Sequence, residues 1–179
     1  MTRPRIIAVA GLPGTGKSTL AERLARETGT PAFAGDWLMG SLAPHGIFED
    51  MDRPTYIALY DGLLETLIVR QLMLGQSAIN DGLIDDETAG RWGRLAAAHA
   101  AELKVIECVC GDTELHRSRL EGRVRGIPGW HEIDWEHVER MREEFPPLTV
   151  ERLVLDAVDP VETNLAKARD YLGTPRQPA

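Results

Sequence analysis

Cysteine is scarce in this sequence, since Cys108 and Cys110 are the only two among 179 residues. Side chains two positions apart on a strand share a face and rarely form a disulfide, so both are expected to be reduced thiols. Long apolar runs are also missing, because none approaches the roughly 18 residues that suggest a membrane-spanning helix. The opening residues, MTRPRIIAVAG, lack a signal-peptide cleavage pattern. We therefore expect a cytoplasmic protein, without secretion, membrane spanning or a disulfide scaffold.

Positive charge is in the minority, with 20 Lys and Arg against 28 Asp and Glu and a net charge of −8. This balance argues against a non-specific duplex-binding protein, although it allows a small basic pocket on an acidic body. Metal-ligand spacing is absent as well, so no protein-bound zinc is expected at His45, His99, His116 or His137. The length and the 43% hydrophobic content fit one globular domain over residues 1–179, either as a monomer or as a homodimer.

Short β-like runs alternate with helical stretches along the chain, which predicts an α/β fold with a parallel sheet covered on both faces. The predicted strands are residues 5–10, 31–34, 77–81, 104–110 and 152–155. The predicted helices are residues 17–28, 54–74, 87–101, 112–124, about 135–141, and 160–172. Residues 37–52 contain glycine, proline and mixed aromatics, and are expected to form a loop or a short helix.

Residues 11–18 (GLPGTGKS) match the pattern G-x-x-x-x-G-K-[ST] without a gap, between a predicted strand and a predicted helix. The glycines let backbone N–H groups turn inward around phosphates, and the helix N-terminus adds unpaired donors. Lys17 can reach the β- and γ-phosphates, and Ser18 can supply an oxygen to Mg²⁺. The pattern thus predicts ATP and Mg²⁺ as cofactors. The expected nucleotide-binding residues are Gly11, Gly14, Thr15, Gly16, Lys17, Ser18 and Thr19.

Other nucleotide-binding classes fit the sequence less well. A GTPase switch needs a base-reading N-K-x-D segment, which is absent. A large AAA-type motor needs a longer chain and an apolar run that ends in Asp-Glu, whereas residues 78–81 (AIND) supply one carboxylate. A small phosphotransferase is the class that fits best.

Two carboxylates follow predicted strands and are expected at the same edge of the sheet as the phosphate loop. Asp36, after the second strand, is a candidate catalytic base that accepts a proton from the attacking hydroxyl. It is equally placed to cap a short helix that starts near Trp37. Asp81 ends the third strand and can hold a water bound to Mg²⁺. Its Asn-Asp-Gly context is also an ordinary turn sequence.

The region of about residues 36–75 is expected to form the acceptor side of the site. Trp37 and Tyr60 are candidates for an acceptor pocket, because such pockets combine aromatic side chains with a few polar groups. Tyr60 also has the helical spacing of a core residue. On the helix after the third strand, Arg91 has a glutamate at i−4, whereas Arg94 has no carboxylate within a turn. Either arginine is a candidate to hold a polar or anionic group of the substrate.

Arginines are concentrated in a predicted lid, about residues 117–135. Arg117 has glutamates at i−3 and i+4 and is expected to form a structural ion pair. Arg119 and Arg123 have no carboxylate at helical spacing and lie four residues apart, where two guanidinium groups repel unless an anion lies between them. A triphosphate is such an anion, so both are expected to bind phosphate and to act in catalysis. Arg125 has Glu121 at i−4, in a loop that is expected to close over the site.

The order of these features resembles the small P-loop kinases: GLPGTGKST, then Asp36, then Asn80-Asp81, then the arginine-bearing lid, then VLD at 154–156. That group includes gluconate kinases, shikimate kinases, chloramphenicol phosphotransferases, zeta-type toxins and the kinase domain of polynucleotide kinases, and its members are often named simply AAA-family ATPases. The resemblance implies a three-layer P-loop fold with strand order 2-3-1-4-5. It also implies that Asp36 is the hydroxyl-activating carboxylate and that Arg119 and Arg123 are the lid arginines that contact phosphates or flank adenine.

The resemblance implies an ATP- and Mg²⁺-dependent transfer of phosphate to a hydroxyl of a small molecule, such as a sugar-like compound, a nucleoside or an antibiotic. The acceptor signatures of the group are missing. Polynucleotide kinases carry an arginine three residues beyond the catalytic Asp, where this chain has Met39, and the glycine triplet of shikimate kinases is absent. Two alternatives stay open. One is a nucleic-acid 5′-hydroxyl kinase, and the other is a partner-regulated ATPase in which Asp36 is only a cap.

Overall fold

A computed structural model describes residues 3–173, in which five parallel strands form one sheet in the order β2-β3-β1-β4-β5. The strands are β1 (Arg5–Ala10), β2 (Ala32–Ala34), β3 (Ala78–Asp81), β4 (Glu102–Val109) and β5 (Leu153–Asp156). Every neighbouring pair is parallel. The predicted fold class and strand order are therefore confirmed.

Within the described residues, seven α-helices connect or flank these strands. They are α1 (Lys17–Thr28), α2 (Gly35–Leu42), α3 (Arg53–Met73), α4 (Asp86–Ala98), α5 (Thr113–Glu121), α6 (Trp135–Glu144) and α7 (Val161–Leu172), with a 3₁₀ turn η1 (Ala43–His45) after α2. Four helices begin after an aspartate whose carboxylate accepts a hydrogen bond from a backbone N–H three residues later, which satisfies an otherwise free donor. These caps are Asp52, Asp85, Asp112 and Asp134.

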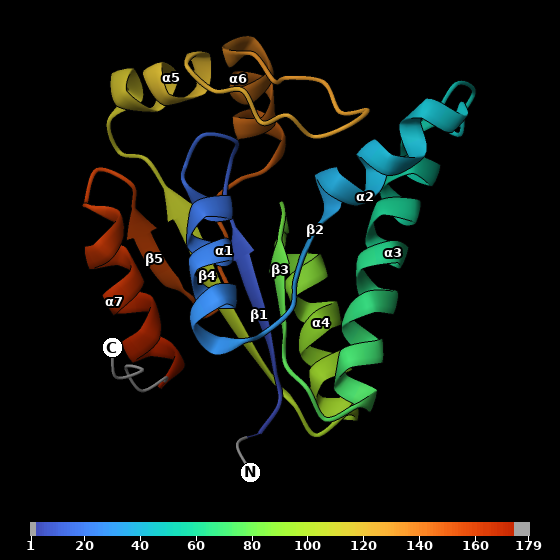
Figure 1. The fold of residues 1–179 in the computed structure, drawn as a ribbon, viewed down its shortest axis with the longest axis vertical. Helices are drawn as coiled ribbons and strands as arrows, with labels where there is room; N and C mark the ends of the chain where they lie inside the picture. Colours follow the sequence, from blue (N-terminus) through green and yellow to red (C-terminus); the bar gives the residue numbers. More distant parts are fainter. Residues whose placement is uncertain (1–2, 174–179) are drawn as a thin grey trace.

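The sheet has a hydrophobic core on each face, because successive side chains of its central strand point to opposite sides. Ile6 and Ala8 of β1 pack on one face with residues of α3 and α4. Ile7 and Val9 pack on the other face with residues of α1 and α7. Figure 1 shows these two helical layers and, above the carboxyl ends of the strands, the lid formed by α5, α6 and the loop between them. The lid thus covers the edge where parallel sheets bind ligands.

Several helix boundaries differ from the prediction; α6, for example, ends at Glu144 instead of about residue 141. A helix, α2, begins at Gly35, two residues before the segment that was expected to be a loop or a short helix. The helix α4 ends at Ala98 instead of residue 101, because the chain turns there and Ala100 has a φ of 52° before β4 begins. The helix α5 ends at Glu121 instead of residue 124, at a glycine that favours helix termination. Within residues 3–173, no helix has the length and apolar character needed to cross a membrane.

Candidate active site

The phosphate loop lies between β1 and α1, as its sequence context predicts. Gly11 has a φ of 143°, and a Cβ there would overlap the carbonyl oxygen of Cys108 in β4. Gly16 has a φ of 83° and forms the N-terminal cap of α1. Between them, the Thr15 hydroxyl donates a hydrogen bond of 2.8 Å to the carbonyl of Leu12. The sequence therefore folds locally into a strand-loop-helix turn that only glycine allows at these two positions.

Lys17, at the end of this loop, and Asp81, at the end of β3, are both buried, and Ser18 next to Lys17 is half-buried. Burial lowers the pKa of Lys17, and the negative charges of Asp81 and Asp36 oppose that shift. Burial likewise raises the pKa of Asp81, against the positive charge of Lys17. The Ser18 Oγ and Asp81 Oδ1 atoms are buried without a hydrogen-bond partner among the described residues. Two orphaned oxygens of this kind fit Mg²⁺, which prefers oxygen ligands and retains several waters.

One cavity of about 780 Å³ joins the phosphate loop to the lid and to residues around β2 and α2. Its size is that of an ordinary small-molecule site. Besides the phosphate loop and α1, three regions and the ends of β3 and β4 line the cavity. The region around β2 and α2 contributes Ala32, Phe33, Ala34, Trp37 and Leu38, and the lid contributes Arg119, Arg123, Arg125 and Ile127. The region around β5 and α7 contributes Leu155, Ala157, Asp159, Val161 and Asn164, and β3 and β4 contribute Asp81 and Cys108.

The lid arginines differ in their contacts. Arg117 pairs with Glu121 at 2.8 Å on the exposed face of α5, which confirms its predicted structural role. Arg119 points to the cavity and donates a hydrogen bond of 2.7 Å to the carbonyl of Ala157, after β5. Arg123 also lines the cavity, and burial and the charge of Arg125 lower its pKa. Because α5 ends at Glu121, the assumed i, i+4 repulsion between Arg119 and Arg123 within one helix is wrong, although both reach the cavity.

Asp36 is not a helix cap. The N-cap of α2 is Ala34, and no side chain caps this helix. Instead, the Asp36 Oδ2 atom accepts a hydrogen bond from the Arg125 guanidinium. Arg125 lies beyond the end of α5, so its helical spacing to Glu121 does not describe its contacts. Arg125 is the site residue that sequence reasoning missed, and the Gly and Pro residues after it were the signal that helical spacing does not apply there.

Tyr60 of α3 lies behind the two carboxylates rather than in the cavity lining. A Cβ on Gly35 would overlap its ring, and a Cβ on Gly82 would lie 2.8 Å from its hydroxyl. These glycines directly precede Asp36 and directly follow Asp81. Burial raises the pKa of Tyr60 far above its ordinary value, and the charges of Asp36 and Asp81 add to the shift. Tyr60 thus packs as a neutral side chain against the backbone next to both carboxylates.

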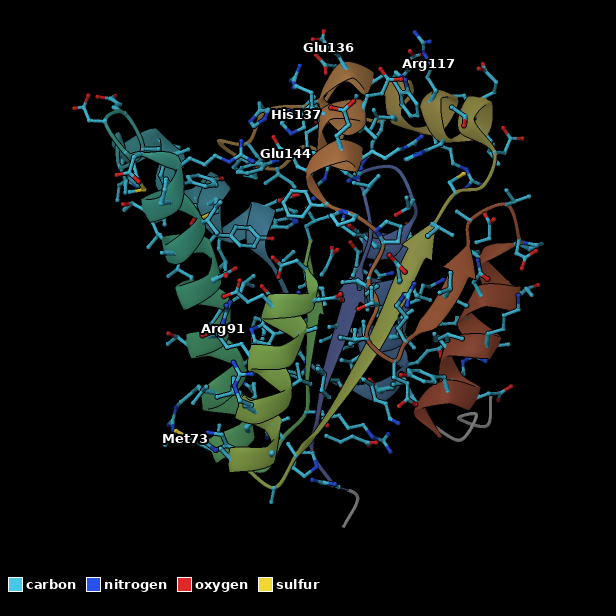
Figure 2. All side chains as sticks on the ribbon, turned by 180° about the vertical axis from the view of Figure 1, so that it is seen from behind. Met73, Arg91, Arg117, Glu136, His137 and Glu144 are labelled. Carbon is cyan, nitrogen blue, oxygen red and sulfur yellow. The ribbon has the colours of Figure 1, made fainter. Side chains whose placement is uncertain are left out.

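Trp37, by contrast, lines the cavity and is 52% exposed. Arg91 and Arg94 do not line it, so the structure gives no support to their expected contact with substrate. Arg91 forms ion pairs with Asp61 at 2.6 Å and Glu65 at 2.5 Å instead of the predicted local pair. Figure 2 shows Arg91 between α4 and α3, well below the lid that carries Arg117. Arg94 is exposed on the same helix.

His116 is a second residue whose role its sequence context did not reveal. It is 1% exposed in α5. Its Nε2 atom donates a hydrogen bond of 2.7 Å to the Pro13 carbonyl of the phosphate loop, and its Nδ1 atom accepts one of 3.4 Å from Arg142 of α6. The ring of Trp135 packs edge-on against it. From the sequence we expected only that no zinc is bound at His116, and in the structure this residue connects the phosphate loop to both lid helices.

Comparisons with known proteins are consistent with this geometry. The model of the AAA domain family matches residues 6–148. A search of curated proteins gives no match. Among solved structures, a sugar kinase from Janibacter sp. is 16% identical with a TM-score of 0.67, over 97% of this chain and 96% of that chain.

Two further structures have the same architecture. A gluconokinase from Sinorhizobium meliloti is 15% identical with a TM-score of 0.69, over 96% of this chain and 92% of that chain. Kti12 from Chaetomium thermophilum, in complex with ADP-AlF₃, is 17% identical with a TM-score of 0.67, over 94% of this chain and 98% of that chain. At these identities the likeness shows the fold, which kinases and Kti12 share.

Proposed function

The chain belongs to the AAA domain family and has the fold of the small P-loop kinases, and from this premise we propose that it transfers the γ-phosphate of ATP to a hydroxyl of a small molecule. The observation that carries the proposal is the single cavity that joins the phosphate loop and lid arginines to the acceptor side around Trp37. Asp36 lies at that side, paired with Arg125 of the cavity lining. A site built only to bind nucleotide needs no second compartment with a carboxylate next to it.

On the nucleotide side, Lys17, Arg119 and Arg123 supply positive charge where negative charge spreads over the phosphoryl oxygens during transfer. The burial of Lys17 strengthens its interaction with phosphate, because buried charges are poorly screened. The segment after β5, including Ala157 and Asp159, lines the cavity beside Arg119 and is proposed to enclose the base. Ser18 and Asp81 would hold Mg²⁺, which neutralises phosphate charge.

On the acceptor side, Asp36 is proposed to orient the acceptor hydroxyl and to take its proton as the phosphorus–oxygen bond forms. The walls there are largely apolar, with Phe33, Trp37, Leu38 and Ile127 in the lining. Buried hydroxyls without partners are unfavourable, so this half of the cavity suits a compound with a ring and few hydroxyls better than an open-chain polyol.

A nucleic-acid 5′-hydroxyl kinase is the weaker candidate. The net charge of −8 opposes binding of a polyanion. Met39, at the position where polynucleotide kinases have an arginine, is uncharged and fully buried, so it offers a phosphate no contact. A partner-regulated ATPase is the other alternative, and the fold that this chain shares with Kti12 is compatible with it.

ATP consumption and product formation by the purified protein test the proposal against a panel of hydroxyl compounds. The panel contains nucleosides, ring-bearing hydroxylated antibiotics, sugars, open-chain sugar acids and a 5′-hydroxyl oligonucleotide. We expect stimulation by a ring-bearing compound. Asp36→Asn should lower that stimulated rate by about 100-fold or more while the protein still binds ATP. If no compound of the panel raises ATP consumption and a protein partner does, the proposal is contradicted and the regulated ATPase is favoured.

A further inference from the structure

The lid loop, residues 122–134, packs directly on the helix that carries Asp36. A Cβ on Gly40 of α2 would lie only 2.5 Å from the Pro128 carbonyl oxygen and 3.1 Å from Ile127. A Cβ on Gly129 would overlap the carbonyl oxygen of Gly40 in turn. Two backbone segments approach this closely only where neither carries a side chain. The lid loop therefore has a defined position against α2 in this structure, which places Arg125 next to Asp36.

The Asp36–Arg125 ion pair is largely shielded from water. The Arg125 side chain is 11% exposed and that of Asp36 is 24% exposed. Arg125 belongs to the cavity lining, whereas Asp36 does not, within the part of the chain that the structure describes. Arg125 therefore lies on the cavity side of Asp36. Its guanidinium donates to the carboxylate that the acceptor hydroxyl would need as its own hydrogen-bond acceptor.

The charges around Arg125 favour a different partner once an anion enters the cavity. Arg119, Arg123 and Arg125 all line it, together with Lys17. Arg123 and Arg125 line the same cavity, where their like charges repel; burial, and then the charge of Arg125, lower the pKa of Arg123. A triphosphate would relieve this repulsion and compete with Asp36 for Arg125, because arginine binds phosphate oxygens as well as carboxylates.

From these contacts we propose that Arg125 is a positioning residue that exchanges partners. It holds the Asp36 carboxylate when the cavity contains no triphosphate, and it turns to the phosphates when ATP binds, which releases Asp36 to the acceptor hydroxyl. This inference rests on the proposed kinase function. It links nucleotide binding to exposure of the carboxylate through one side chain, so ATP would have to bind before Asp36 becomes available.

A double-mutant cycle on nucleotide affinity tests the exchange without any acceptor. The dissociation constant of a non-hydrolysable ATP analogue with Mg²⁺ is measured by calorimetry for the wild type, Asp36→Asn, Arg125→Ala and the double variant. If Asp36 competes with phosphate for Arg125, Asp36→Asn should tighten binding by about 5-fold, the size of a modest ion pair. In the Arg125→Ala background the same change should leave the affinity within about 1.5-fold.

The control variant is Arg117→Ala, which removes an exposed arginine of the same lid that pairs with Glu121. In that background Asp36→Asn should still tighten binding by the full factor. An equal gain with and without Arg125 would overturn the proposal, since Asp36 would then act by general repulsion of phosphate. No gain in either background would overturn it as well. Arg125→Gln, which keeps three side-chain carbons and removes the charge, replaces Arg125→Ala in the cycle if the alanine variant does not fold.

A purely structural role for Arg125 would change the analogue's affinity by the same factor whichever residue stands at position 36, so the cycle separates it from the exchange. The outcome is also independent of the acceptor panel. A positive cycle in a protein whose ATPase responds to a protein partner and to no hydroxyl compound would refute the kinase function and keep the exchange of partners. If the protein phosphorylates an acceptor but the effect of Asp36→Asn on nucleotide affinity does not depend on Arg125, the kinase function is kept and the exchange of partners is refuted.

Discussion

At the scale of single residues, two arginines of the same helix should have different effects on catalysis. Arg119 lines the cavity and is anchored at the Ala157 carbonyl, whereas Arg117 pairs with Glu121 on the exposed face. A donor aimed at developing phosphate charge contributes far more than an exposed ion pair. We expect Arg119→Ala to lower the turnover number at least about 10-fold more than Arg117→Ala, as measured by steady-state ATP consumption with an acceptor.

Circular dichroism of both variants provides the control, because each should keep the helical content of the wild type. The reverse order of effects would refute the assignment of Arg119 to the nucleotide. If both variants lower the turnover number slightly and equally, Arg123 would be the lid arginine that stabilises the phosphate charge. Arg123 lines the same cavity, and burial and the charge of Arg125 lower its pKa.

His116 gives the molecule a pH-dependent contact between the phosphate loop and the lid. Burial lowers the pKa of His116 below its ordinary value of 6.5, and the cationic Arg142 and Arg119 lower it further, against the hydrogen bond to Pro13. Between that lowered pKa and 6.5, the unfolded chain binds more protons at this position than the folded chain does. The stability that this site contributes is therefore complete above about pH 6.5 and is lost as the pH falls through that window.

Urea unfolding at pH 7.5 and pH 5.5 tests this dependence. The difference in the free energy of unfolding between the two pH values should be smaller for His116→Gln than for the wild type, because glutamine can still donate to the Pro13 carbonyl but does not titrate. His99→Gln, at the end of α4 and outside the lid, is the matched control and should retain the wild-type difference. An unchanged pH dependence in His116→Gln would show that His116 does not carry it.

At the scale of elements, the contact between the lid loop and α2 can be tested with a matched pair of glycine substitutions. Gly40→Ala places a methyl group 2.5 Å from the Pro128 carbonyl oxygen, so the loop must move away from α2. Gly62→Ala, in α3, meets no atom within 4 Å. We expect Gly40→Ala to destabilise the protein by about 1–3 kcal/mol and Gly62→Ala to stabilise it by about 0.5–1 kcal/mol, measured by urea unfolding.

In the Gly40→Ala variant, the effect of Asp36→Asn on nucleotide affinity should also depend less on Arg125. Asp36 and Arg125 lie on either side of the contact between Gly40 and Pro128, which the methyl group displaces. If Gly40→Ala is as stable as the wild type, the lid loop does not rest on α2 in solution, and the position of Arg125 beside Asp36 loses its support. The Gly62→Ala result excludes a general effect of replacing glycine in a helix.

The helix starts could be predicted from the sequence better than the helix ends, and this difference decided which site residues were found. Aspartates such as Asp112 mark starts because their carboxylates satisfy a free N–H within three residues. The end of α5 at Glu121 depends on weak preferences and on the loop that follows. A prediction that extended the helix to residue 124 therefore described Arg125 by its spacing to Glu121 and missed its contact with Asp36.

At the scale of the whole molecule, the sheet could be predicted because its order follows from alternating strands and helices and from the resemblance to P-loop kinases. The phosphate loop could be predicted because all of its residues are adjacent in sequence. The pairing of Asp36 with Arg125 spans 89 positions, and that of His116 with Pro13 spans 103. Such contacts depend on how lid and sheet pack, which no local pattern encodes.

The cavity lies between parts of the molecule that are far apart in the sequence, so its ligand should stabilise the whole fold. Mg²⁺-ATP at 100 times its dissociation constant adds about 2.7 kcal/mol, which corresponds to a rise in Tm of about 5–10 °C for a chain of this size. Thermal unfolding should show this rise in the wild type and none in Lys17→Ala, which lacks the buried ammonium of the phosphate loop.

The rise in Tm on ATP binding, measured with and without Mg²⁺, tests the role of Ser18 and Asp81. Their buried, unpartnered oxygens gain a ligand only when Mg²⁺ accompanies the nucleotide. ATP with EDTA should therefore raise the Tm of the wild type less than ATP with Mg²⁺ does, and Ser18→Ala should narrow this gap while it retains the rise with EDTA. An equal rise with and without Mg²⁺ in the wild type would mean that these oxygens do not hold the metal, and Asp81 would then serve only to balance the charge of Lys17.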